Sequence, residues 1–185
     1  KYAKLKDQDD RIVAVAPVVL EDIMIITKNG YGLRFNVEEV PVVGAKAAGV
    51  KAINLKDGDQ VAAAFKSTTP SMYILTQRGS LKRMLQDDIP VTSRAKRGLQ
   101  VLRELKNKPH RVFKAGPVFT DQGDFDLFTS QEEVAEQDQI LQITSTTGQV
   151  TEIDLTQLSI SERTSNGSFV NDTILDQEVF SATIK

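Results

Sequence analysis

The sequence repeats itself, and this repeat restricts the possible folds more than any other feature. Four positions recur 49 residues later in a second copy: Thr27 and Thr76, Gly30 and Gly79, Pro41 and Pro90, Gly49 and Gly98. A third, weaker copy lies a further 69 residues along the chain, with Gly148 and Gly167 in place of Gly79 and Gly98. A period of roughly 40–50 residues is typical of propeller-like arrays of four-stranded sheets.

Each copy has the pattern of strands. Residues 23–27 form a short apolar run, Asn29-Gly30 is a strong signal for a two-residue hairpin turn, and residues 33–37 alternate between apolar and polar. The i, i+3, i+4, i+7 spacing of an amphipathic helix is not found in the copies. We therefore predict an all-β, propeller-like fold in one domain, with copies at 23–66, 72–115 and 139–185. Residues 1–22 match the end of a copy whose beginning is missing, so we expect a fragment, and residues 117–139 form an acidic connection.

The charges are separated along the chain, although the net charge is only −2. Residues 24–114 hold 17 lysines and arginines against 7 acidic residues, a net charge of +10. Residues 115–185 hold 2 against 13, a net charge of −11. A basic stretch of this size is typical of proteins that bind a polyanion. The alternative is ordinary solvated surface, but several basic residues recur at equivalent positions of the copies.

Two basic loops follow the hairpins of the first two copies. GAKAAG at 44–49 and SRAKRG at 93–98 combine lysine and arginine with small residues that let backbone N–H groups approach a phosphate. Arg34 and Arg83 are equivalent, and we expect both to leave their sheets on the same side. The third copy has ERTSNG at 162–167 and carries Glu152 in place of the arginine. We therefore expect the first two copies, and not the third, to contact nucleic acid.

The chain lacks residues that most catalytic and metal sites need. It has no cysteine, and its single histidine, His110, has no second histidine with which to form such a site, so we expect it at the surface. No phosphate-cradling or nucleophile motif occurs. No apolar run approaches the roughly 20 residues of a membrane span, and no secretory leader opens the chain. We expect no catalytic site, no metal and no membrane partner.

The copies resemble the C-terminal domains of type IIA topoisomerase A subunits, a family shared by gyrase and topoisomerase IV. The stretches that carry the likeness are IITKNGYGLRF at 25–35, VPVVGAKAAGVKAINLKDGD at 40–59, YILTQRGSLKR at 73–83 and IPVTSRAKRG at 89–98. The resemblance covers nearly the whole chain and is strongest over residues 23–114. Gyrase carries a Gln-Arg-Arg-Gly-Gly-Lys-Gly box in one such loop, and no loop here contains it, so the loops are more similar to those of topoisomerase IV.

The resemblance implies a β-pinwheel, a propeller-like disc of four-stranded blades in which neighbouring blades exchange strands. It implies that a basic rim binds and bends double-stranded DNA and presents a segment to the cleavage core, for ATP-dependent decatenation and supercoil relaxation. Further implied partners are the remainder of the enzyme's A subunit and its ATPase B subunit, in the bacterial cytoplasm at the nucleoid. This domain would need no cofactor, since ATP and Mg²⁺ act in other parts of the enzyme. The active-site tyrosine belongs to a separate region, so Tyr2, Tyr31 and Tyr73 receive no catalytic role.

The predicted phosphate contacts are basic residues of the first two copies. They are Lys28, Arg34, Lys46, Lys51, Arg78, Lys82, Arg83, Arg94, Lys96, Arg97 and Arg103. Binding through them would be independent of sequence and driven by counterion release. Two alternatives stay open: a gyrase DNA-wrapping domain whose box lies upstream, and a propeller-like scaffold that docks proteins through residues 119–139. A continuous band of positive charge would favour DNA, and scattered charge would favour the scaffold.

Overall fold

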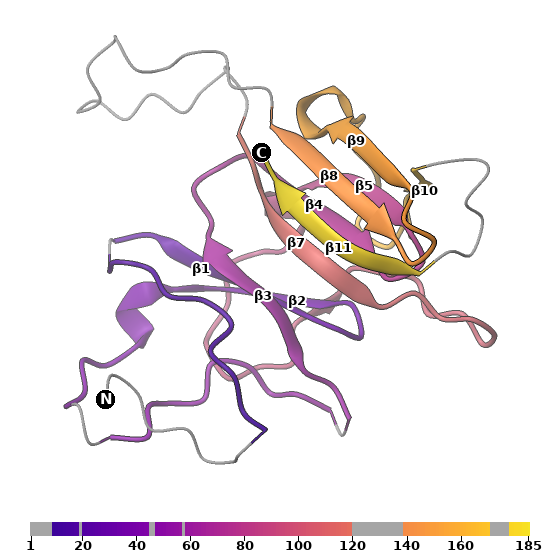
Figure 1. The fold of residues 1–185 in the computed structure, drawn as a ribbon. Coiled ribbons are helices and arrows are strands. Elements are labelled where there is room, and N and C mark those ends of the chain that lie inside the picture. Colours follow the sequence, from indigo (N-terminus) through magenta and orange to yellow (C-terminus); the bar gives the residue numbers. More distant parts are fainter. Residues whose placement is uncertain (1–8, 19, 45–46, 57, 120–138, 171–177) are drawn as a thin grey trace, which may run out of the picture.

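The fold is built from antiparallel sheets. The computed structural model describes residues 9–18, 20–44, 47–56, 58–119, 139–170 and 178–185. These residues form three sheets and three one-turn 3-10 helices, with no α-helix among them (Figure 1). The predicted all-β fold with four-stranded, propeller-like blades is confirmed.

The first two sheets each contain a strand from the following copy. The first sheet has the order β3-β1-β2-β6, with β1 (Asp22–Thr27), β2 (Tyr31–Asn36), β3 (Val61–Lys66) and β6 (Leu99–Gln100). The second has the order β10-β5-β4-β7, with β4 (Ser71–Thr76), β5 (Ser80–Leu85), β7 (Val112–Val118) and β10 (Ser168–Phe169). Thus β6 of the second copy pairs with β2, and β10 of the third copy pairs with β5. This exchange is the feature that distinguishes a pinwheel from an ordinary propeller.

The third sheet lies in front of the second in the view of Figure 1. It has the order β11-β8-β9, with β8 (Ile140–Ser145), β9 (Val150–Asp154) and β11 (Val179–Ile184). Residues 9–18, from the predicted partial copy, are described and belong to no strand. The acidic connection lies almost wholly outside the described residues, as does the docking segment proposed within it.

The hairpin turn is built in the same way in all three copies. A glycine N–H donates to the carbonyl three residues earlier, at 3.0 Å in each copy, and the residue after the glycine donates to the hydroxyl of that earlier residue at 3.1–3.2 Å. The equivalent pairs are Thr27 and Gly30, Thr76 and Gly79, Ser145 and Gly148. Each glycine has φ between +74° and +85°, whereas Asn29 does not have a positive φ. The predicted two-residue turn is therefore wrong in detail, because one glycine and a hydroxyl group close a longer turn.

Two hydrophobic cores lie between successive sheets. In β4, Met72 and Ile74 join the core shared with the first sheet, and Tyr73 and Leu75 join the core shared with the third. All six residues of β4 are buried, because successive side chains of a strand point to opposite faces and both faces are covered. Each large apolar side chain buried in this way contributes about 1.5–3 kcal/mol. The apolar runs of the sequence thus mark strands buried on both faces.

Short 3-10 helices turn the chain away from each hairpin. They are η1 (Val37–Glu39), η2 (Gln86–Asp88) and η3 (Leu155–Gln157). The side chain of Asp154 caps η3 by accepting bonds from the hydroxyl of Thr156 at 2.7 Å and from its N–H at 2.9 Å. The hydroxyl bond is the main reason why the pKa of Asp154 lies below its usual value. After each of these helices the chain continues into a loop.

Candidate nucleic-acid interface

The loops after the three hairpins lie beside one another. We call residues 47–54, 91–103 and 160–169 the first, second and third loops, and together the loop band. The second loop docks on β2 where Thr92 N–H donates to Arg34 O at 2.9 Å, and the third docks on β5 where Ser161 N–H donates to Arg83 O at 2.7 Å. The second and third loops are thus each anchored on the sheet of the preceding copy.

The contacts between loops make this band continuous. Ala95 N–H donates to Ala52 O and Asn54 N–H donates to Lys96 O, both at 2.8 Å, which joins the first loop to the second. Arg103 N–H donates to Asn166 Oδ1 at 2.8 Å, which joins the second loop to the third. Basic side chains on neighbouring loops are therefore held in a fixed spatial order.

Four of the predicted contact residues have exposed cationic groups. Lys51, Lys96 and Arg103 belong to the loop band, and Lys28 lies at the hairpin turn of the first copy. The ammonium groups of Lys28 and Lys96 donate to neutral oxygens, Gln60 Oε1 at 2.7 Å and Thr92 Oγ1 at 2.8 Å. Within the described part of the chain, none of the four has a carboxylate within ion-pair distance. Their positive charge is therefore not neutralised locally. Lys46 lies outside the described residues.

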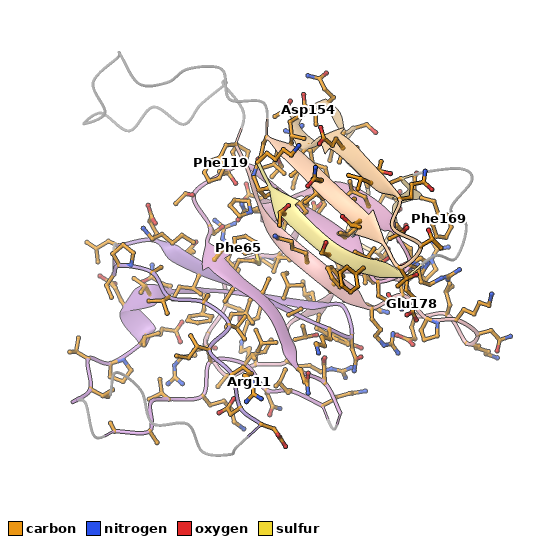
Figure 2. The ribbon with its side chains drawn as sticks, in the orientation of Figure 1. Arg11, Phe65, Phe119, Asp154, Phe169 and Glu178 are labelled. Atoms are coloured by element: carbon orange, nitrogen blue, oxygen red, sulfur yellow. The ribbon has the colours of Figure 1, made fainter. Side chains whose placement is uncertain are left out.

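Two further predicted residues, Arg78 and Arg97, are half-buried against aromatic rings. The Arg97 guanidinium carbon lies 4.1 Å from the centre of the Tyr31 ring, and that of Arg78 lies 5.6 Å from the Phe169 ring. Figure 2 shows Phe169 beside the second and third sheets, at the end where Glu178 also lies. Such cation–π contacts are worth about 0.5–2 kcal/mol and help to fix the position of a guanidinium. This supporting role of Tyr31 and Phe169 was not predicted from the sequence.

Arg34 and Arg83 tie neighbouring copies together. Arg34, with a side chain 16% exposed, donates to Asp22 Oδ2 at 3.0 Å in its own sheet and to Asp87 Oδ1 at 2.7 Å in η2 of the next copy. Arg83 likewise donates to Ser71 Oγ at 2.9 Å and to the carbonyl oxygen of Thr156, in η3, at 2.7 Å. Both side chains reach the 3-10 helix of the following copy. We therefore assign both a structural role and do not count them among the free cations of the interface.

Arg94 has the same kind of role. Its Nη1 donates to Lys51 O, and the equivalent arginine of the third copy, Arg163, donates through Nη1 to Gln100 O. Lys51 and Gln100 are themselves equivalent, so one arginine contact recurs at both junctions. Arg163 was not among the predicted residues, although its position 69 residues after Arg94 could have identified it.

Lys82 lies in the interior of the protein. It is 2% exposed, and its ammonium group donates to the carbonyl oxygens of Val101 and Arg163, both at 2.6 Å. A phosphate outside the protein cannot reach this group without moving the third loop. We correct the sequence-based assignment accordingly and leave Lys82 out of the interface.

The expectation that His110 lies at the surface is wrong. His110 is 6% exposed, with Nδ1 3.1 Å from Thr76 Oγ1 and Nε2 3.3 Å from Arg78 Nη1. Its ring lies 6.1 Å from that of Phe169, which β10 of the third copy contributes. The sequence around His110 could not indicate this burial, because the covering strand comes from about 60 residues later.

We expect Arg83→Met to destabilise the fold while leaving its aliphatic packing in place. The substitution removes the donors to Ser71 and Thr156, and half-buried acceptors that lose a charged donor cost about 1–3 kcal/mol. Urea unfolding followed by circular dichroism measures this loss. The exposed Lys96→Met variant, as a control, should stay within about 0.5 kcal/mol of the unmodified chain. If Arg83→Met and Lys96→Met are equally stable, the contacts of Arg83 with Ser71 and Thr156 do not stabilise the fold.

The described residues show neither a metal site nor a membrane span. Among residues 9–119 and 139–185, apart from the gaps given above, no group of three or more histidine or acidic side chains converges to hold an ion. In the same part of the chain, no helix is long and apolar enough to cross a bilayer.

A family model and several curated proteins match this chain. A family model described as the DNA gyrase C-terminal domain, beta-propeller, matches residues 21–68 and 71–118, more than half of the chain. The chain is 60% identical to the A subunit of DNA topoisomerase 4 from Streptococcus pyogenes over 184 residues, which covers 98% of this chain and 22% of that protein. The chain thus spans about a fifth of the length of the curated relatives it matches.

Solved structures show the same fold. The crystal structure of the C-terminal domain of DNA topoisomerase IV matches with a TM-score of 0.81 and 33% identity, covering 99% of this chain and 52% of the other. The C-terminal domain of the DNA gyrase A protein matches with a TM-score of 0.67 and 18% identity, covering 89% of this chain and 50% of the other. At 18% identity, the match to the gyrase A domain shows only that the fold is shared.

Proposed function

Because the chain belongs to the DNA gyrase C-terminal domain family, and resembles topoisomerase IV A subunits within it, we propose that it is the DNA-binding module of such a protein. The observation that carries this proposal is the continuous loop band, whose exposed cations have no carboxylate partner among the described residues. Lys51, Lys96 and Arg103 would contact the phosphates directly. Lys28 would extend the contact to the hairpin turn of the first copy.

The same geometry supports recognition that does not depend on sequence. Flexible lysine side chains bind phosphate oxygens as point charges, and each contact releases condensed counterions from the duplex. Arg78 and Arg97, placed on their aromatic rings, would add contacts of fixed position. Bending a duplex of 20–30 base pairs costs on the order of 1–6 kcal/mol, which several such contacts offset. In this proposal the chain both binds and bends DNA.

The charge of the third copy would set the limit of the contact. The third copy has Ser165 where the second copy has Lys96. On β9, Glu152 occupies the position of Arg34 and Arg83 and pairs with Lys185. The DNA path would therefore follow the first two copies and leave the protein at the third.

We propose that the module serves the whole enzyme by presenting a bound DNA segment to the cleavage core, for ATP-dependent decatenation and supercoil relaxation. ATP and Mg²⁺ would act elsewhere in the enzyme, and the partners would be the rest of its A subunit and the ATPase B subunit in the bacterial cytoplasm. The loops of this chain lack the gyrase box, which favours topoisomerase IV over the gyrase alternative.

A salt titration of the unmodified chain with two 30-base-pair duplexes of unrelated sequence tests the proposal. We expect similar affinity for both duplexes and a linear fall of log K with log salt, with a slope of about −3.6 to −5.4 for four to six phosphate contacts. Energy transfer between dyes at the duplex ends should rise on binding if the DNA bends. No binding at 50 mM salt would refute the proposed function. Binding without a change in energy transfer would refute the bending.

A further inference from the structure

The two junctions between copies are closed by different kinds of contact. At the first junction, Ala52 O accepts from Ala95 N–H at 2.8 Å, a bond between two backbone groups. Ala95 adopts φ +64° to make this contact, and it is one of only two non-glycine residues with positive φ in the described part of the chain. At the second junction the equivalent carbonyl, Val101 O, accepts instead from Lys82 Nζ at 2.6 Å. A side chain has thus replaced a backbone donor.

Lys82 occupies the centre of this second junction. Its ammonium group donates to Val101 O in the second loop, to Arg163 O in the third loop at 2.6 Å, and to Glu162 O at 3.5 Å. Gly167 packs so closely that a Cβ there would lie 2.9 Å from Lys82 Cβ. The first copy has Leu33 in the equivalent place, 1% exposed and unable to make any such bond. The Lys82 amine therefore bridges the loops of two copies, beside the Arg103–Asn166 and Arg163–Gln100 contacts. Its neutral form keeps two N–H donors, enough for the two bonds at 2.6 Å.

The charged groups around Lys82 do not neutralise it. Arg163 of the third loop repels the ammonium group, Asp88 of η2 attracts it, and Glu162 presents only its backbone carbonyl within hydrogen-bond reach. Burial, followed by the repulsion from Arg163, lowers the pKa of Lys82 to about 7. When the third loop moves away, water reaches the amine, which then binds a proton more tightly.

We propose that Lys82 is a proton-sensitive clasp that closes the junction between the second and third copies, while the first junction, which has Leu33 in this place, does not respond over the same pH range. The open or unfolded form binds the proton more tightly than the closed form, so closure strengthens as the pH rises from about 7 toward 10.5. Below about pH 7 both forms are protonated and closure no longer changes with pH. This inference concerns the chain alone and does not depend on DNA binding.

Direct titration of the lysine side chains tests the clasp in the unmodified protein. Nuclear magnetic resonance of the lysine Cε–Hε groups follows each amine separately between pH 5 and 11. We expect the Lys82 signal to titrate near pH 7, because burial lowers the pKa of this amine. A Lys82 signal that titrates near the ordinary lysine pKa of about 10.4 would overturn the proposal.

Unfolding of a variant provides the second test. Lys82→Leu introduces the side chain found at this position in the first copy, and Lys96→Leu is the control for removing an exposed lysine. Between pH 6 and pH 9, the folding equilibrium constant of the unmodified chain should rise on the order of 10- to 100-fold relative to Lys82→Leu. Relative to Lys96→Leu it should not change. If the ratio of the folding equilibrium constants of the unmodified chain and Lys82→Leu stays constant between pH 6 and pH 9, the clasp is contradicted. If Lys82→Leu does not fold, the resonance titration of Lys82 decides.

Discussion

Gly98→Ala is expected to lower the free energy of unfolding by about 2–5 kcal/mol. Gly98 has φ +85°, and a left-handed conformation costs a non-glycine residue about 1–2 kcal/mol. A Cβ at this position would also lie 2.3 Å from Gly32 O, a backbone atom of β2, and such overpacking adds about 1–3 kcal/mol. Urea unfolding followed by far-ultraviolet circular dichroism measures the sum.

Gly49→Ala is the matched control for this prediction. Gly49 occupies the equivalent position of the first copy, has φ +78° and has no atom within 4 Å of its ideal Cβ. Its substitution should therefore cost only the conformational part, about 1–2 kcal/mol. The difference between the two variants isolates the close approach of the second loop to β2. If both variants lose the same free energy of unfolding, the second loop does not approach β2 as closely as the structure shows.

Removing two exposed cations from the loop band should weaken DNA binding by about 30–100-fold at 0.1 M salt. Lys96→Gln combined with Arg103→Gln eliminates two proposed phosphate contacts, each contributing about 0.9 to the slope of log K against log salt. The slope should therefore become less steep by about 2, while the free energy of unfolding stays within about 0.5 kcal/mol per site. A fluorescence binding titration at several salt concentrations measures both quantities.

The control for this variant removes the same charge elsewhere. Lys66 lies 3.8 Å from Glu21, and Lys185 pairs with Glu152, so both cations already have carboxylate partners outside the loop band. The double variant Lys66→Gln with Lys185→Gln changes the net charge equally but should reduce affinity by less than about threefold, because distant charges are screened by salt. If both double variants weaken binding to the same extent, net charge and not the loop band controls the interaction.

The sheets could be predicted from the sequence because their determinants are local. The turn of each copy needs one glycine and one hydroxyl residue at fixed spacing, and Thr27 with Gly30 supplies both in the first copy. Apolar runs such as residues 71–76 report burial on both faces, whatever covers them. The turn geometry itself was harder to predict, since the same dipeptide, Asn29-Gly30, is compatible with more than one turn.

The contact residues of the candidate site were harder to predict, because a basic residue can recur at equivalent positions of the copies for two different reasons. Arg34 and Arg83 recur since the junction between copies recurs, and each needs the same tie to the next 3-10 helix. Lys96 and Arg103 do not recur, and the structure leaves them exposed. In a repeat protein, a basic residue shared by successive copies is therefore at least as good a sign of packing as of a ligand.

Burial that depends on a later copy could not be inferred from local sequence at all. Lys82 looks like the exposed residue of an alternating strand until the third loop covers it, and His110 looks exposed until Phe169 does. Both depend on residues about 60–80 positions away in the chain.

The exchanged strands also constrain the order in which this protein is made. The hairpin ending at Asn36 stays incomplete until Leu99 and Gln100 leave the ribosome, and β5 waits until Ser168 and Phe169 do. At roughly 5–20 residues per second, each edge remains unpaired for several seconds in a growing chain. Open edges invite pairing with other nascent chains, and charged side chains on an edge strand discourage it. We therefore expect Arg34 on β2 and Arg83 on β5 to discourage such pairing during synthesis, before the copies they finally join exist.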